Sequence, residues 1–246
     1  MGWAIAGAVV VALAIGVALW LRWLSRRRVY WFERLTNAIP IHSDWWKSQR
    51  ALTGELLYVA IGDSAAQGIG ASKPGRSYVG EVARHIRAVS SKELRVVNLG
   101  ISGATVGIAL KKELPALAKL DPDIVTVSIG ANDMASFEPT RFAAEIETLF
   151  AALPSHAIVA DLPTFYFLPA EKKVRIANQI LREAAARHSL VVVPLHEVMR
   201  RQGLWGVTTQ FAGDLFHPND RGYKVWASAF YAAVDARLRE LRATAR

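Results

Sequence analysis

The composition of the chain indicates an apolar, basic protein. Of its 246 residues, 52% are apolar or aromatic and 21% are charged, and the formal net charge is +9. This is too apolar for a disordered chain and fits one domain with an additional segment. The absence of cysteine excludes a disulfide scaffold, a cysteine-ligated metal site, a cysteine nucleophile and thiol redox chemistry.

The first segment, residues 2–21, contains no charged side chain. A helix of about 20 residues spans the roughly 30 Å hydrocarbon core of a bilayer, so we predict a membrane anchor through residues 2–24. Tryptophans and a basic cluster that extends to residue 28 follow, as at a membrane boundary: Trp20, Trp23, Arg22, Arg26, Arg27 and Arg28. A cleaved signal peptide is the alternative, but its basic n-region and small-residue cleavage site are missing.

The positive-inside rule places the rest of this single-pass membrane protein in the cytoplasm, with an extracytoplasmic domain as the alternative. Residues 29–55 are rich in aromatic and basic side chains, among them Trp31, Trp45 and Trp46. We interpret them as an amphipathic linker along the membrane surface, and a hairpin packed on the globular domain is the alternative. The globular domain is expected over residues 56–246.

Within that domain, short β-branched runs alternate with helical patterns, which predicts an α/β fold with a parallel sheet covered on both faces. The expected strands are apolar enough for burial on both sides: Leu57–Ile61, Leu94–Leu99, Ile124–Ile129, Ala157–Asp161 and Leu190–Pro194. Apolar residues at three- and four-residue spacing predict the helices Ser77–Val89, Thr105–Leu120, Thr140–Leu153, Ala170–His188 and Asp220–Arg242. In such sheets, functional residues gather beyond the C-terminal ends of the strands.

The loops at that edge carry the groups that acyl transfer needs. Ser64 follows the first strand as a candidate nucleophile, and the His217 imidazole suits a general base near neutral pH. Asp214 can orient that imidazole and stabilise its charged form. The backbone amides of Ser64 and Gly103 and the side-chain amide of Asn132 can donate to an oxyanion. We read Asp63 and Asp133 as hydrogen-bond partners that hold these loops.

These blocks resemble those of the SGNH, or GDSL-type, hydrolase family, from about Leu56 to the final helix. The resemblance implies a three-layer α/β/α sandwich, similar to flavodoxin, with a five-stranded parallel sheet. It also implies the Ser64, His217 and Asp214 triad and an oxyanion hole formed by Ser64, Gly103 and Asn132. The leucine common after Gly-Asp-Ser in the family is Ala65 here, which alters packing behind the nucleophile without removing a reacting group.

Apolar side chains near the active edge indicate an acyl pocket, with ordinary loop packing as the alternative. They are Met134, Phe137, Phe165, Tyr166 and Phe167. We therefore expect a serine esterase that hydrolyses acyl esters, lipid-derived ones included, through an acyl-enzyme intermediate. The alternatives are O-deacetylation of a carbohydrate or envelope polymer, O-acyl transfer to a hydroxyl acceptor, and a non-catalytic binding module tethered to the membrane.

Other functional motifs are incomplete. The Gly-x-Ser-x-Gly elbow of α/β-hydrolases is not met, because Ala66 stands where its last glycine would be. His196 and Glu197 begin a zinc-protease pattern, but Arg200 stands in place of the second histidine. Phosphate-loop and dinucleotide-binding motifs are missing after Ser64. We therefore expect no cofactor, no metal and no nucleic-acid partner, and a small-molecule or lipid-like ester as the substrate.

Overall fold

The computed structural model describes residues 2–166 and 168–244, and in them a parallel sheet has the strand order β2-β1-β3-β4-β5. The strands are β1 (Leu56–Gly62), β2 (Leu94–Asn98), β3 (Ile124–Ser128), β4 (Ile158–Ala160) and β5 (Val191–Val193). This confirms the predicted five-stranded parallel sheet. The expected burial of every strand is wrong for β5, an edge strand on which Val191 is 50% exposed.

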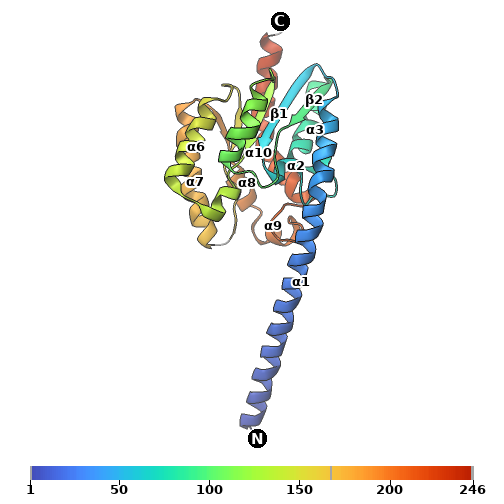
Figure 1. The fold of residues 1–246 in the computed structure, drawn as a ribbon, viewed down its shortest axis with the longest axis vertical. Helices are drawn as coiled ribbons and strands as arrows, with labels where there is room; N and C mark the ends of the chain where they lie inside the picture. The colour runs from blue at the N-terminus through green and yellow to red at the C-terminus, as the bar shows by residue number, and fades with distance from the viewer. Residues whose placement is uncertain (1, 167, 245–246) are drawn as a thin grey trace.

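Helices cover both faces of the sheet, as the sequence pattern predicts (Figure 1). The longer ones are α3 (Tyr78–Ser90), α6 (Pro139–Ala151), α7 (Leu168–Arg187) and α10 (Asp220–Thr244). Shorter helical segments lie in the connections: α2 (Ser64–Gln67), η1 (Pro74–Arg76), α4 (Val106–Ile108), η2 (Ala109–Glu113), α5 (Leu114–Leu117), η3 (Asn132–Ser136), α8 (Leu195–Arg200) and α9 (Gly203–Thr209). The single helix expected at Thr105–Leu120 is instead α4, a π-helical turn and α5. Pro115 explains the break, because proline donates no N–H and its ring crowds the preceding turn.

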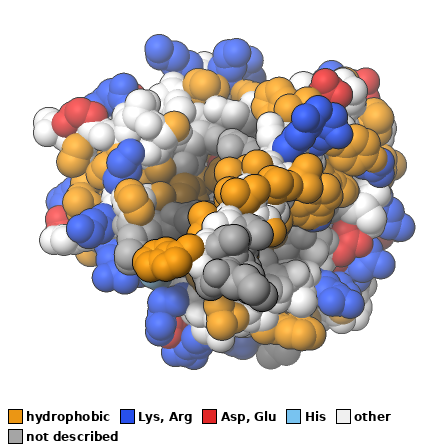
Figure 2. Space-filling view, turned by 90° about the horizontal axis from the view of Figure 1, so that it is seen from below, with side chains coloured by type: hydrophobic (Ala, Val, Ile, Leu, Met, Phe, Trp, Pro, Cys, Tyr) orange, Lys and Arg blue, Asp and Glu red, His pale blue; other side chains and the backbone are white. Residues whose placement is uncertain are grey.

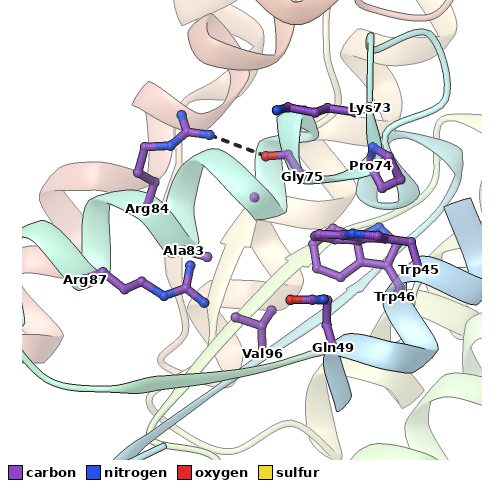
Figure 3. Close-up of a pocket in the computed structure, with 11 residues that line it drawn as sticks. Trp45, Trp46, Gln49, Lys73, Pro74, Gly75, Ala83, Arg84, Arg87 and Val96 are labelled. Carbon is purple, nitrogen blue, oxygen red and sulfur yellow. Dashed lines mark hydrogen bonds between the residues drawn. The ribbon is translucent and has the colours of Figure 1, made fainter. Parts of the chain in front are cut away.

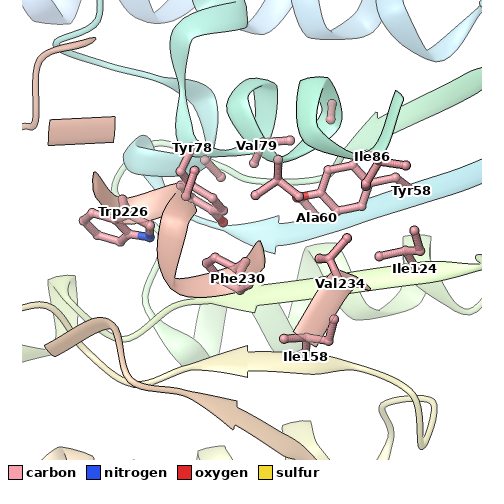
Figure 4. Packing of buried hydrophobic residues seen from close by; sticks show 14 of the residues in the cluster. Tyr58, Ala60, Tyr78, Val79, Ile86, Ile124, Ile158, Trp226, Phe230 and Val234 are labelled. Atoms are coloured by element: carbon pink, nitrogen blue, oxygen red, sulfur yellow. The ribbon is translucent and has the colours of Figure 1, made fainter. Parts of the chain in front are cut away.

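The two faces of the sheet bury separate hydrophobic cores. Along β1, Tyr58 and Ala60 belong to the core beneath α3 and α10, while Val59 and Ile61 belong to the core beneath α6 and α7. In the first core, Tyr78 stacks on Trp226 and on Phe230, with ring centroids 5.7 Å apart in each pair (Figure 4). Successive side chains of a strand point to opposite faces of the sheet, so β1 contributes alternately to the two cores.

A single helix, α1 (Gly2–Arg50), includes both the predicted anchor and most of the predicted linker. Its second half packs on the domain and buries Leu35, His42 and Trp46, so residues 29–50 do not form the alternative hairpin. Its first half projects away from the domain (Figure 1), and Trp3, Val10 and Trp20 are among its exposed side chains.

Within the described residues, no helix has the length and apolarity needed to cross a bilayer. The prediction of a single-pass membrane protein anchored through residues 2–24 is therefore wrong, and the positive-inside argument that placed the domain in the cytoplasm no longer applies. Instead of a separate span, these residues form the start of α1, which continues through Arg26 and Arg27 to the surface of the domain, where the Arg27 Nε donates to the Gly213 carbonyl at 3.2 Å.

Candidate active site

Ser64 begins α2, directly after the C-terminal end of β1. The Asp63 side chain caps this short helix by accepting a hydrogen bond from the Ala65 N–H at 2.9 Å. Gly68 ends the helix with φ 85°, a left-handed conformation that glycine adopts without steric cost. The nucleophile candidate is therefore held on a single helical turn with both ends defined.

The loop after α9 brings His217 and Asp214 to Ser64. The His217 Nε2 lies 3.0 Å from the Ser64 Oγ, and its Nδ1 lies 2.6 Å from the Asp214 Oδ2. The other Asp214 oxygen accepts from the backbone N–H groups of Phe216 and His217, at 3.1 Å each. A Cβ at Gly70 would lie 2.5 Å from the Pro218 carbonyl oxygen and 2.9 Å from the His217 Cβ, so glycine there lets the two loops approach.

The surroundings of Asp214 keep its carboxylate ionised. Burial raises the pKa of this group, but hydrogen bonds from the His217 ring and from the two backbone amides outweigh burial, so its pKa lies below the ordinary value. An ionised carboxylate orients the imidazole through its Nδ1–H and stabilises the imidazolium that forms when Nε2 takes a proton.

The predicted oxyanion-hole residues lie on loops after three neighbouring strands. Asn132 follows β3, and its Nδ2 donates to the Ala104 carbonyl at 2.9 Å and to the Asp63 Oδ2 at 3.3 Å. Gly103 lies beside Ala104 in the loop after β2 and has φ 78°. The Asn132 contacts thus connect all three loops, and Asn132 lines the same cavity as Ser64.

Three buried carboxyl groups support these loops. Burial raises the pKa of Asp63 and of Asp133 to about 6 each, although backbone N–H groups oppose the shift in both cases. Asp133 accepts from the Val106 N–H at 3.1 Å, which agrees with its expected loop-holding role. Sequence reasoning missed Glu113, which accepts from the Gly62 N–H at 2.9 Å. Glu113 shares one buried helical face with Ala109 and Leu117, at a spacing of four residues. That spacing could have predicted its burial from the sequence.

A cavity of about 430 Å³ opens beside Ser64 and His217. Two predicted pocket residues, Phe165 and Tyr166, line it, whereas Phe167 lies outside the described residues. The prediction that Met134 and Phe137 line the pocket is wrong, because both pack against the core beneath α6 and α7 and not into the cavity.

Sequence reasoning missed most of the apolar wall of this cavity, which comes from α8, α9 and the loop that follows: Met199, Leu204, Val207, Phe211, Leu215 and Phe216. The sequence pattern predicted no helix between residues 195 and 219, so it did not indicate that these side chains would face the active edge. α9 lies at the lower end of the domain in Figure 1, and Figure 2, seen from below, shows hydrophobic side chains gathered on this face. In the part of the chain that the structure describes, no three histidines, aspartates or glutamates are grouped to hold a metal ion.

Comparisons with known proteins support the fold and the class of reaction. The sequence model of the GDSL-like lipase/acylhydrolase family matches residues 60–225. An α/β hydrolase from the metagenome of Lake Arreo, Spain, is 26% identical, with a TM-score of 0.63 over 76% of this chain and 98% of that one.

Two further solved structures show the same fold at lower identity. The lipase/acylhydrolase from Enterococcus faecalis is 24% identical, with a TM-score of 0.63 over 74% of this chain and 96% of that one. The acetylxylan esterase Axe2 from Geobacillus stearothermophilus is 21% identical, with a TM-score of 0.59 over 73% and 94%. No curated protein matches the sequence. The chain therefore belongs to the GDSL-like lipase/acylhydrolase family and is an enzyme that hydrolyses ester bonds.

Proposed function

We propose that the chain is a serine esterase that cleaves esters with an apolar acyl chain, using Ser64 as nucleophile, His217 as general base and Asp214 as its orienting carboxylate. The observation that carries the proposal is the continuous contact from the Asp214 carboxylate through both His217 nitrogens to the Ser64 hydroxyl, at 2.6 and 3.0 Å. Ser64 and His217 line the apolar cavity, which can hold the acyl chain.

In the first half-reaction, the Ser64 Oγ attacks the ester carbonyl carbon while the His217 Nε2 takes the hydroxyl proton of Ser64. The carbonyl oxygen becomes an oxyanion, to which the amides of Ser64, Gly103 and Asn132 donate in the proposed hole. The C–O bond to the alcohol then breaks, and the alcohol leaves with the proton that His217 returns. Water attacks the acyl-enzyme in the same way, and the carboxylic acid leaves as Ser64 regains its proton.

The apolar wall supports an acyl chain longer than acetyl. Phe165 and Phe216 pack edge to face with ring centroids 6.0 Å apart, and Phe216 also packs on the His217 ring at 5.1 Å. The Tyr166 hydroxyl donates to the Met199 carbonyl at 2.7 Å, which leaves its ring as an apolar surface of the cavity. Apolar surface beside the nucleophile contributes about 0.8 kcal/mol for each methylene that it removes from water.

The experiment compares p-nitrophenyl esters from acetate to decanoate with the wild type and Ser64→Ala. We expect kcat/KM to fall by at least about 10³-fold in the variant and to rise with acyl length in the wild type. Ser228→Ala is the matched control, since the exposed Ser228 hydroxyl on α10 donates to the Val225 carbonyl at 2.6 Å, within its own helix. Full activity of a folded Ser64→Ala protein would disprove the proposed nucleophile, and a rate highest for acetate would favour O-deacetylation.

A further inference from the structure

A second cavity, of about 370 Å³, lies between the C-terminal end of α1 and the helix α3 and shares no lining residue with the cavity beside Ser64. Its volume falls within the usual range for small-molecule sites. α1 provides Trp45, Trp46 and Gln49, while η1 and α3 provide the opposite wall. Figure 3 shows the two indoles on one side and the side chains of Arg84 and Arg87 on the other.

The cavity is lined by three cations and by no acidic side chain: Lys73, Arg84 and Arg87. Arg84 pairs with the buried Glu81, which Arg76 also approaches at 3.6 Å. The Arg87 guanidinium donates only to the Leu94 carbonyl, at 3.3 Å, and among the described residues neither it nor Lys73 forms an ion pair. Two cations without an ion-pair partner among the described residues therefore lie at the edge of this cavity, where they attract an anion.

The opposite wall offers a flat apolar surface. Trp45 and Trp46 pack edge to face with centroids 4.6 Å apart, and Trp46 is 3% exposed whereas Trp45 is only half-buried. A Cβ at Gly75 would lie 3.3 Å from the Trp45 ring, so any side chain at this position would crowd the indole. An indole face of this kind stacks with a flat ring.

We propose that this cavity binds a small organic anion that carries a flat ring, with the anionic group at Lys73, Arg84 and Arg87 and the ring against Trp45. The cation cluster alone would favour any anion, and the indole alone any apolar ring. Because the two lie on opposite walls of one cavity, a molecule that carries both groups gains both contacts with a single loss of translational freedom.

The occupant would lie one side chain away from the nucleophile loop. The Trp46 Nε1 donates to the Gln67 carbonyl at 3.1 Å, and the His42 Nδ1 lies 2.9 Å from the same oxygen. Gln67 is the last residue of α2, the helix that Ser64 begins. The binding proposal does not depend on the esterase assignment, so it is tested by binding alone.

The test titrates the full chain with phenyl phosphate by calorimetry. Inorganic phosphate carries the charge without the ring, and benzyl alcohol carries the ring without the charge. We expect phenyl phosphate to bind one molecule per chain, and each fragment to bind at least about tenfold more weakly. Arg87→Gln and Trp45→Leu should each weaken phenyl phosphate binding at least about fivefold, and Trp45→Phe should restore most of the affinity.

Lys172→Gln is the matched control, because it removes one exposed positive charge on α7, far from this cavity in the fold, and should leave binding unchanged. Leu204→Ala, which alters the cavity beside Ser64, should also leave it unchanged. Circular dichroism establishes that the variants are folded. Absence of binding to the wild type, equal affinity for phenyl phosphate and inorganic phosphate, or binding unaffected by Arg87→Gln would each overturn the proposal.

Discussion

The Ser64 loop depends on the side chain of the residue before it, Asp63. Asp63 caps α2 with one oxygen and accepts from the Asn132 Nδ2 with the other. The carboxylate is thus placed to hold both α2, which begins with the proposed nucleophile, and an amide of the proposed oxyanion hole. We regard it as a positioning residue, because it acts through Ser64 and Asn132.

Replacing Asp63 should therefore affect turnover more than substrate binding. In Asp63→Ala, we expect kcat for p-nitrophenyl butyrate to fall at least about tenfold while KM changes less than about threefold, because Asn132 loses an acceptor that orients it. Asp63→Asn keeps an oxygen that can accept from the Ala65 N–H but turns an NH2 group, which cannot accept, toward the Asn132 Nδ2, so its kcat should stay low although α2 keeps its cap. An Asp63→Ala enzyme with normal kcat would contradict this role, as would a loss confined to KM.

Glu113 makes stability depend on pH. Burial raises its pKa to about 8 from an ordinary value of 4.5, a shift that the Gly62 N–H opposes and the Asp63 charge increases. A raised carboxyl pKa in the folded state favours folding fully below about pH 4.5, and this contribution is lost as the pH rises toward 8. The folded protein should therefore hold Glu113 protonated at neutral pH.

Glu113→Gln removes this titration. Relative to wild type, the free energy of unfolding of the variant should rise by more than about 1 kcal/mol between pH 5 and pH 8, since glutamine carries no charge to desolvate. Urea unfolding at both pH values measures the difference. Asp63 titrates in both proteins, so the part of its contribution that does not arise from its coupling to Glu113 cancels. Parallel pH dependences in wild type and variant would show that Glu113 does not titrate in this range.

At the scale of elements, α8, α9 and the loop to His217 form the apolar wall of the active-site cavity. The short α9 has few buried residues, and Leu204 and Trp205 on it are 84% and 68% exposed. Leu204 and Val207 line the cavity, whereas Trp205 does not. Substitutions at Leu204 and Val207 therefore test the cavity wall, and a substitution at Trp205 on the same helix is the control.

The double variant Leu204→Ala and Val207→Ala should lower kcat/KM for p-nitrophenyl octanoate at least about fivefold, because the acyl chain loses apolar contact area. Hydrolysis of the acetate ester should change less than about twofold. Trp205→Ala, on the same helix, should leave the ratio of octanoate to acetate rates unchanged. Equal losses on both esters in the double variant would indicate that this wall does not contact the acyl chain.

At the scale of the whole molecule, the two halves of α1 differ in their relation to the domain. Most of the described side chains of the first half are exposed, while Leu35, His42 and Trp46 of the second half are buried against the domain. Trp46 also donates to the Gln67 carbonyl. The contribution of α1 to folding stability should therefore come from residues after Arg26.

Deletion of residues 2–23 should leave the midpoint of urea unfolding unchanged within error, since their described side chains are exposed. Trp46→Ala should lower the free energy of unfolding by about 3 kcal/mol or more, because it removes a buried indole and its hydrogen bond. Both proteins are compared in the same buffer by urea unfolding. A large loss of stability in the truncated chain would show that the exposed half of α1 has a structural partner.

Much of the fold could be predicted from the sequence because the signals involved are local. Strand β1 differs from its predicted bounds by one residue at each end, and α10 begins at the predicted Asp220. Apolar runs and helical spacing report directly on burial and periodicity. The positions of Ser64 and Asn132 at one edge also follow, since each comes after a strand and parallel strands all end at the same side of a sheet. Their catalytic roles stay predictions.

Periodicity and residue type are enough to predict the parallel sheet, the edge at which the loops gather and the residue types that meet there. The fold sets which way side chains face where the pattern is ambiguous: Met134 and Phe137 enter the core, while Phe216 faces the cavity. It also decided that α1 continues onto the domain and that Glu113 lies beneath the nucleophile loop. These outcomes depend on contacts between segments distant in the chain, to which local periodicity is insensitive.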